Sequence, residues 1–199
     1  VTLVATSNIV PDGLYKDGLQ RARFLPAIAL IKQNTEIVNV DSGVDYRLRH
    51  LEQAELFHFP LNDAAQESLR KSFRALTPEC TQAVENDKLI IENRQIIALR
   101  TCDDVAWFEF RQLCDGPRSQ NDYIELGKIF HAVILSGVEQ MGVTTDDIAR
   151  RFINMVDEFY DRNVKLIISA EVELKDLYTG GRLNFEFQRT LSRLLEMQS

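Results

Sequence analysis

Short apolar runs that end in polar residues predict strands at the start of the chain. Residues 1–5 are apolar and mostly β-branched, and they run into Thr6-Ser7-Asn8. This composition is typical of a buried parallel strand with a polar tip. Residues 24–33 have helical spacing, and residues 35–40 predict a second short buried strand. We expect these segments to belong to one α/β core layer.

An amphipathic helix is predicted over residues 63–76, with Asp63 as its N-cap. Its apolar stripe contains Leu69, Phe73 and Leu76. The polar residues 77–87 predict a linker after it. Residues 89–91 and 96–99 then flank a turn and predict an antiparallel hairpin, and residues 105–110 supply a third strand that is apolar on both faces.

The last third of the chain predicts a strand–helix–strand unit made of residues 132–135, 145–160 and 164–170. Residues 164–181 align without gaps onto residues 1–18, with Glu171 in place of Asn8. We interpret this as a degenerate internal βαβ repeat. Two unrelated βαβ units with similar apolar strands remain the alternative.

Two further helical patterns lie in this region. Asp157-Glu158 after an apolar run looks like a magnesium-binding strand end, but apolar residues recur there every three or four positions. That spacing predicts a helix with Asp157, Glu158 and Asp161 facing solvent. Residues 183–197 predict a closing amphipathic helix that docks on its own domain, with a partner groove or a membrane surface as the alternative.

Composition narrows the class of protein. The 199 residues are 45% hydrophobic and carry a net charge of −7, which is unfavourable for a broad nucleic-acid interface. No apolar run reaches the length of a membrane span. The three cysteines Cys80, Cys102 and Cys114 lack metal-ligand spacing. They predict free thiols in a reducing cytoplasm and no metal site.

The chemistry-bearing residues lie near the start of the chain. Asn8 would place a carboxamide beyond the carboxyl end of a parallel strand, where ligands bind in open α/β sheets. Arg21 and Arg23 follow a loop rich in Gly and Pro. A guanidinium offered from a subunit edge can stabilise charge on a transferred phosphoryl group. Alternatively, Asn8 caps a turn and the arginines pair with surface acids.

Several motifs together identify a family. They are Ala5-Thr6-Ser7-Asn8, Gly18-Leu19-Gln20-Arg21-Ala22-Arg23-Phe24-Leu25-Pro26, residues 39–49, Pro117-Arg118-Ser119-Gln120-Asn121-Asp122-Tyr123, Ala149-Arg150-Arg151-Phe152 and Phe185-Glu186-Phe187-Gln188-Arg189. In these the chain resembles the AAA+ ATPase family of the bacterial cell-division protein ZapE and its mitochondrial relatives. The resemblance covers essentially the whole chain.

The resemblance implies a role for each candidate residue. Asn8 corresponds to the sensor-1 residue, Arg21 to the arginine finger, and Arg23 is the second choice for the finger. Arg47, in the motif that follows the finger, and Arg151 are candidates for sensing the nucleotide. The alternative is that Arg150 and Arg151 only bind neighbouring carboxylates, and it stays open.

The fold implied is a partial P-loop NTPase core sheet, residues 1–50, a helical connection, residues 51–87, and a mixed α/β C-terminal region, residues 88–199. No Gly-x-x-x-x-Gly-Lys-Ser/Thr motif is present to bind phosphates. We therefore expect a fragment that does not hydrolyse ATP alone, with ATP and Mg²⁺ bound mainly by a missing N-terminal half.

The resemblance also implies partners and a location. It implies a homo-oligomer with the finger acting in trans, the division-ring protein FtsZ as a client, and a cytoplasmic protein that is at most peripheral at the inner membrane. A non-catalytic adaptor that recruits a client is the alternative function.

Overall fold

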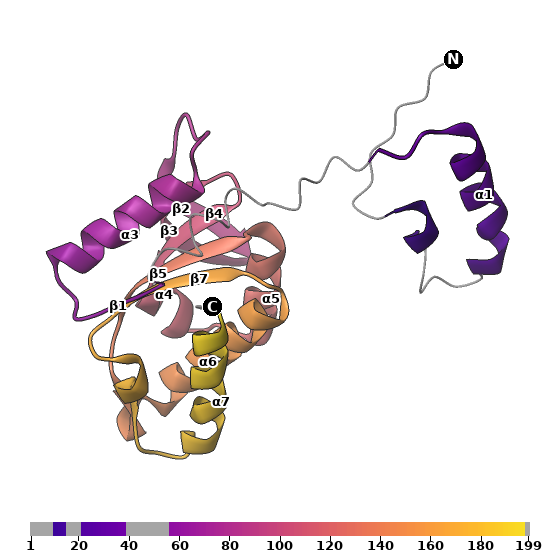
Figure 1. Ribbon diagram of the computed structural model, residues 1–199. Coiled ribbons are helices and arrows are strands. Elements are labelled where there is room, and N and C mark those ends of the chain that lie inside the picture. Colours follow the sequence, from indigo (N-terminus) through magenta and orange to yellow (C-terminus); the bar gives the residue numbers. More distant parts are fainter. Residues whose placement is uncertain (1–9, 15–20, 39–55, 198–199) are drawn as a thin grey trace. The chain divides into compact units, whose positions relative to one another are not determined.

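The computed structural model describes residues 10–14, 21–38 and 56–197, which fall into two units, Val1–Val44 and Asp45–Ser199. Figure 1 shows both units, and each is described here by itself. The strand predicted over residues 1–5 and its polar tip lie outside the described residues. Of the first copy of the predicted repeat, residues 1–18, the structure describes only residues 10–14, so the repeat stays a prediction.

The first unit contains two short 3₁₀ turns and one helix. These are η1 (Pro11–Gly13), η2 (Arg21–Arg23) and α1 (Leu25–Asn34). Helix α1 confirms the helix predicted over residues 24–33. Residues 35–38 are not a strand, and Ile37 and Val38 are 51% and 67% exposed. The prediction of a buried strand is wrong there, because β-branched residues favour a strand only when a neighbouring strand packs beside them.

The second unit is built on a six-stranded mixed sheet. Its strands are β1 (Phe57–His58), β2 (Val84–Ile91), β3 (Arg94–Cys102), β4 (Val105–Glu109), β5 (Ala132–Val138) and β7 (Lys165–Ala170). Their order is β1-β7-β5-β4-β3-β2. Strands β1, β7, β5 and β4 are parallel, and β3 and β2 add an antiparallel edge. The predicted α/β class is therefore confirmed.

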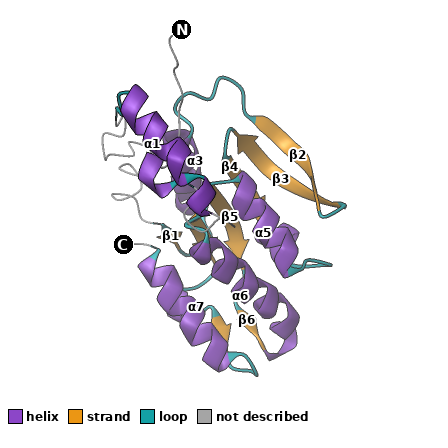
Figure 2. Ribbon diagram, turned by 90° about the vertical axis from the view of Figure 1, so that its right-hand side faces the viewer, coloured by secondary structure: helices purple, strands orange, loops and turns teal. Residues whose placement is uncertain are grey.

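Helices cover both faces of this sheet (Figures 1 and 2). They are α3 (Asp63–Leu76), α4 (Phe110–Cys114), α5 (Gln120–Ile129), α6 (Asp146–Asp161) and α7 (Asn184–Glu196). Helix α3 packs on β4, β5 and β7 from one side, while α4 and α6 cover the other side. Helix α5 packs beside α6, and α7 forms an outer layer on α6.

Helix α3 confirms its predicted apolar stripe. Leu69, Phe73 and Leu76 are buried against strand residues that include Trp107 and Ile134. The N-cap, however, is Asn62 and not Asp63. The Asn62 Oδ1 accepts a hydrogen bond from the backbone N–H of Ala65 at 2.8 Å. Asp63 is instead the first helical residue, where its charge is favourable near the helix N-terminus.

The predicted hairpin is present and longer than expected. Its turn residues Glu92 and Asn93 have φ angles of 49° and 61°, as a two-residue type I′ turn requires. Strand β2 already begins at Val84, so residues 84–87 are strand and not linker. The sequence did not predict this part of the strand, because its side chains are mostly polar. They are polar because β2 is an exposed edge strand. Asp87 accepts a hydrogen bond from Thr101 Oγ1 at 2.6 Å.

The remaining strands follow the sequence pattern closely. Strand β4 has Val105, Ala106, Trp107 and Phe108 buried, which confirms that both of its faces are covered. Strands β5 and β7 pair in parallel and are joined through α6, which confirms the predicted strand–helix–strand unit. After β5 and β7, two short strands, β6 (Met141–Gly142) and β8 (Tyr178–Thr179), form a separate parallel pair.

Helix α6 confirms that Asp157 and Glu158 lie on a helix, but one of the acids is misplaced in the prediction. Glu158 is only 7% exposed. It accepts a hydrogen bond from Gln120 at 2.5 Å and pairs with Arg162. It is buried because α5 packs along α6, a contact that periodicity within α6 cannot reveal.

Helix α7 docks on its own domain, as expected. Phe187 and Leu194 are buried against the α6 layer, and the Phe187 ring stacks on those of Phe152 and Tyr178. Arg189 pairs with Asp157 of α6 at 2.5 Å. Phe185, on the outer side, is 87% exposed. Within the described ranges, no helix is both long and apolar enough to cross a membrane.

The cysteine prediction is wrong for two of the three residues. Cys80 and Cys102 form a disulfide, and only Cys114 is a free thiol. The sequence could not show this, because the contact depends on the end of β3 returning to the loop after α3. Burial keeps the free thiol neutral: it raises the pKa of Cys114 well above its usual range, with Arg151 acting weakly in the opposite direction.

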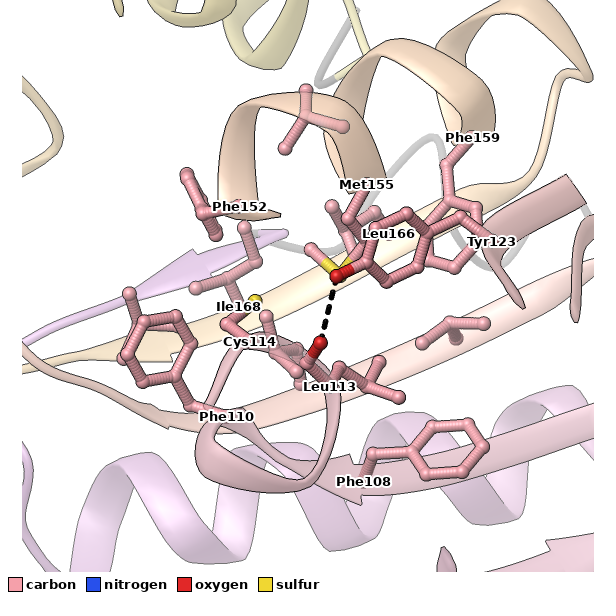
Figure 3. Close-up of a cluster of buried hydrophobic side chains, with 14 of the residues drawn as sticks. Phe108, Phe110, Leu113, Cys114, Tyr123, Phe152, Met155, Phe159, Leu166 and Ile168 are labelled. Atoms are coloured by element: carbon pink, nitrogen blue, oxygen red, sulfur yellow. Dashed lines mark hydrogen bonds between the residues drawn. The ribbon is translucent and has the colours of Figure 1, made fainter. Parts of the chain in front are cut away.

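Tyr123 of α5 is a buried polar group within the core between the sheet and α6. Figure 3 shows its hydroxyl, which donates a hydrogen bond to the backbone carbonyl of Leu113 at 2.8 Å. Burial raises the pKa of this phenol far above its ordinary value of 10.0. The folded chain therefore holds Tyr123 protonated at a pH at which the unfolded chain ionises it.

Alkaline pH should consequently destabilise the chain through Tyr123. Below about pH 10 both states keep the phenol proton; above it the unfolded state loses the proton, so the free energy of unfolding falls by up to ~1.4 kcal/mol per pH unit. Tyr123→Phe should remove this part of the slope while costing about 0.5–1.5 kcal/mol at pH 7. Urea denaturation at about pH 7, 9 and 11 measures both. Parallel pH profiles for the variant and the original chain would contradict the assignment.

Candidate functional site

The 3₁₀ turn η2 places Arg21 and Arg23 in the first unit. Arg21 Nη2 donates a hydrogen bond to the backbone carbonyl of Asp12 in η1 at 2.7 Å. The Asp12 carboxylate in turn accepts hydrogen bonds from Lys32 of α1 at 2.8 and 2.9 Å. Asp12 thus connects η1, η2 and α1, and Arg21 is half-buried at this junction.

Arg23 differs from Arg21 in its surroundings. It is exposed, and no hydrogen bond or ion pair to another described residue holds its guanidinium. Arg21 is therefore positioned by a hydrogen bond within its unit, whereas Arg23 has no such contact with another described residue.

Asn8 and Arg47, the other two candidates from the start of the chain, lie outside the described residues. Arg151 belongs to the second unit and is described there by itself. The complete set of candidate residues therefore stays a prediction, and only the surroundings of three of them are known.

Arg151 lies on α6, where it borders an open pocket of about 550 Å³. We call this the α6 pocket; its lining residues are Asp115, Gly116, Val143, Thr144, Thr145, Asp146, Asp147, Ile148 and Arg151. The Arg151 Nη1 lies 3.4 Å from the backbone carbonyl of Cys114, which accepts its hydrogen bond. This contact links α6 to the end of α4.

The α6 pocket is polar and carries more acids than bases. Asp115, Asp146 and Asp147 face a single guanidinium, that of Arg151. Asp146 Oδ1 accepts a hydrogen bond from Tyr178 Oη at 2.6 Å. The net charge of the lining residues is negative, which is unfavourable for phosphate groups. Only Arg151 and the N-terminus of α6 favour an anion among the groups that line the pocket. In the part of the chain that the structure describes, no three His, Cys, Asp or Glu residues are grouped to bind a metal.

Arg150, the neighbour of Arg151, has a different contact. Its Nη1 lies 3.4 Å from Glu186 Oε1 of α7. The alternative that the arginine pair binds carboxylates therefore describes Arg150, which joins α6 to α7. Arg151 instead donates its described hydrogen bond to a backbone carbonyl, and its charged guanidinium borders the α6 pocket.

The sequence analysis did not predict the turn at residues 178–183, which contacts Asp146 of the α6 pocket. Tyr178 Oη donates to Asp146 and accepts a hydrogen bond from the backbone N–H of Leu183 at 3.2 Å. Gly181 has a φ of 137°, and a Cβ atom there would lie 2.0 Å from Tyr178 Oη. An aromatic residue followed closely by two glycines was the available signal.

The α/β sheet of the second unit, with candidate arginines on η2 and α6, is consistent with a nucleotide-hydrolysing protein, and comparison with known proteins identifies the family. The AFG1-like ATPase family matches residues 1–199, so the chain belongs to this family. No solved structure gives a significant match.

Named relatives agree with this assignment. The chain is 51% identical over 199 residues to the cell division protein ZapE of Escherichia coli K12, covering all of this chain and 52% of that protein. It is 32% identical to the zebrafish lactation elevated protein 1 homolog B, with 46% of that protein covered. A fission-yeast uncharacterized protein is 34% identical, with 89% of this chain and 39% of that protein covered. The chain spans about half the length of the E. coli protein.

Gly181→Ala should be much more destabilising than Gly180→Ala. At Gly181 the added methyl group would displace Tyr178 Oη from Asp146 and Leu183, so the free energy of unfolding should fall by about 2–4 kcal/mol. Gly180 has a φ of 75° with open space around it, so Ala should cost about 1 kcal/mol there. Urea denaturation of both variants compares them, and equal costs would contradict the contact.

Proposed function

We propose that this chain is the part of an ATP-hydrolysing protein that supplies Arg21 to the nucleotide site of a neighbouring subunit. Membership of the AFG1-like ATPase family supports ATP hydrolysis by the whole protein. The single observation that favours Arg21 is its fixed position, because the carbonyl of Asp12 holds one end of its guanidinium at 2.7 Å. A positioned guanidinium stabilises a phosphoryl-transfer transition state without an ordering cost at the moment of reaction.

The remaining roles follow from the same proposal. Asn8 contacts the γ-phosphate in cis as sensor 1, and Arg23 is the second choice for the finger. Arg47 and Arg151 sense the nucleotide. ATP and Mg²⁺ are bound mainly by residues outside this sequence. The 51% identity to the cell division protein ZapE supports a role in cell division. Within that role we propose a cytoplasmic protein, peripheral to the membrane, that remodels a client such as the FtsZ ring.

Arg21→Ala should abolish hydrolysis in the full-length protein and should be rescued in trans. Loss of an arginine finger lowers kcat by about 10³-fold or more. Mixing this variant with a subunit whose phosphate-binding loop is disabled should restore activity, because each supplies what the other lacks. Steady-state ATP turnover of each protein alone and of the mixture is the measurement.

Arg23→Ala is the matched control, two residues away on the same turn. A loss of turnover with Arg23→Ala but not with Arg21→Ala would move the finger to Arg23. Full activity of both variants would overturn the trans-acting role altogether. If the chain binds a client without nucleotide and both variants bind it normally, the non-catalytic adaptor is the better description.

Arg151→Ala should raise the Kd for ATP or lower turnover in the full-length protein, since Arg151 is proposed to contact the nucleotide. Removing a charged hydrogen bond costs about 1.5–3 kcal/mol, which is roughly 10- to 150-fold. Arg150→Ala removes the neighbouring guanidinium, which binds Glu186, and should leave both quantities unchanged. Nucleotide titration measures the Kd and an ATPase assay measures turnover. If both are unchanged in Arg151→Ala, Arg151 does not sense the nucleotide.

A further inference from the structure

The Cys80–Cys102 disulfide lies at the base of the edge hairpin. Cys80 is in the loop between α3 and β2, and Cys102 is the last residue of β3. Their Cα atoms are 6.2 Å apart, and their sequence separation is 22 residues. The first pair of the hairpin ladder, Val84 opposite Thr101, is directly adjacent. The bond therefore closes the segment that contains the whole hairpin.

The hairpin has few other attachments to the sheet. Strand β3 pairs with β4 only over Arg100–Cys102, opposite Val105–Trp107. Within the described structure, the rest of β3 is paired with β2 alone. The tip is held by Arg94, which pairs with the buried Asp122 at 2.5 Å. The base is held by three rungs of the ladder, by the disulfide and by partly buried side chains that pack against the core beneath α3.

The disulfide also connects the hairpin to α3. Beyond the end of α3, Thr77 Oγ1 donates to the carbonyl of Phe73 at 2.7 Å, and the N–H of Cys80 donates to the carbonyl of Thr77 at 3.2 Å. Residues 77–80 thus form a turn that is hydrogen-bonded to the end of the helix. From the other side, the Arg100 guanidinium lies 5.4 Å from the centre of the Phe73 ring. Cleaving the bond leaves this side-chain packing to hold α3 and β3 together at this end.

The three cysteines differ in their access to reagents. Cys80 and Cys102 are both partly exposed, so we expect other thiols to reach the bond. Cys114 is fully buried, and burial suppresses its ionisation. Because the thiolate is the reactive form, Cys114 should stay inert while the pair exchanges.

We propose that the Cys80–Cys102 disulfide is a reversible redox clamp that fixes the edge hairpin to α3. In the oxidised chain, β2 and β3 are fastened at their base to the helix that covers one face of the sheet. In the reduced chain, the loop of residues 77–83 and the adjoining rungs of β2 open locally. The attachment of the hairpin to α3 at this edge of the sheet thereby depends on the thiol–disulfide balance.

The chemistry uses a low-molecular-weight disulfide such as oxidised glutathione as the oxidant. The Cys80 thiolate attacks one sulfur of the oxidant, forming a mixed disulfide and releasing one glutathione thiolate. The Cys102 thiolate then attacks the Cys80 sulfur, forming the protein disulfide and releasing the second glutathione. Two electrons pass from the protein to the oxidant, and the two thiol protons go to solvent or to the released glutathione. Excess glutathione reverses both steps.

Counting thiols tests whether the bond forms. The chain is equilibrated in glutathione buffers from oxidising to reducing, acid-quenched, and alkylated in denaturant for intact mass measurement. We expect one alkylated thiol at the oxidising end and three at the reducing end. Cys80→Ser and Cys102→Ser should form no intramolecular disulfide. Cys114→Ala should have no alkylated thiol at the oxidising end and two at the reducing end. Three thiols at every ratio would overturn the proposal.

Conformation tests whether the bond acts as a clamp. Reduction should lower the Tm by roughly 4–16 °C, the range expected for a disulfide in a chain of this size. It should also accelerate hydrogen exchange in residues 77–91 by roughly 10-fold or more, with little change in β5 and β7. Both effects should vanish in Cys80→Ser and Cys102→Ser and persist in Cys114→Ala. A bond that forms without changing either quantity would overturn the clamp.

Discussion

The parallel pairing of β4, β5 and β7 is the constraint on which the rest of the second unit depends. These strands are buried on both faces, so their backbone N–H and C=O groups have only neighbouring strands to bind. Parallel neighbours need a crossover between them, and each crossover supplies a covering helix. The positions of α4, α5 and α6 on one face therefore follow from this pairing. The opposite face needs α3, which arrives from β1 at the far edge of the parallel strands.

Much of this arrangement can be predicted from the sequence, for identifiable physical reasons. Strands β4 and β5 are almost continuously apolar because both faces are covered, and α3 has a clear stripe because only one of its faces is buried. Where the structure of a segment depends on a neighbour that is distant in the sequence, its hydrophobic pattern does not predict that structure. Residues 35–38 have strand composition but pair with no strand in the described part of the chain, and Glu158 looks solvent-facing until α5 covers it.

The candidate site shows the same division. Residue types and their order along the chain were sufficient to identify the family, because a motif such as Gly18–Pro26 is specific without coordinates. Contacts between segments were not predictable. Nothing in the spacing of Arg150 and Arg151 shows that one reaches a carboxylate and the other a backbone carbonyl. The Cys80–Cys102 contact likewise depends on where two segments meet in the folded chain.

The contact between Arg21 and Asp12 has an electrostatic consequence. Asp12 offers Arg21 its backbone carbonyl, which is a neutral acceptor, while its carboxylate is bound by Lys32. The guanidinium is thus oriented by a group that carries no formal charge. A direct pair with a carboxylate would have positioned Arg21 equally well but compensated its charge, and a phosphate would then have had to compete for it. Through these two groups Asp12 fixes the direction of Arg21, and no described carboxylate forms an ion pair with its guanidinium.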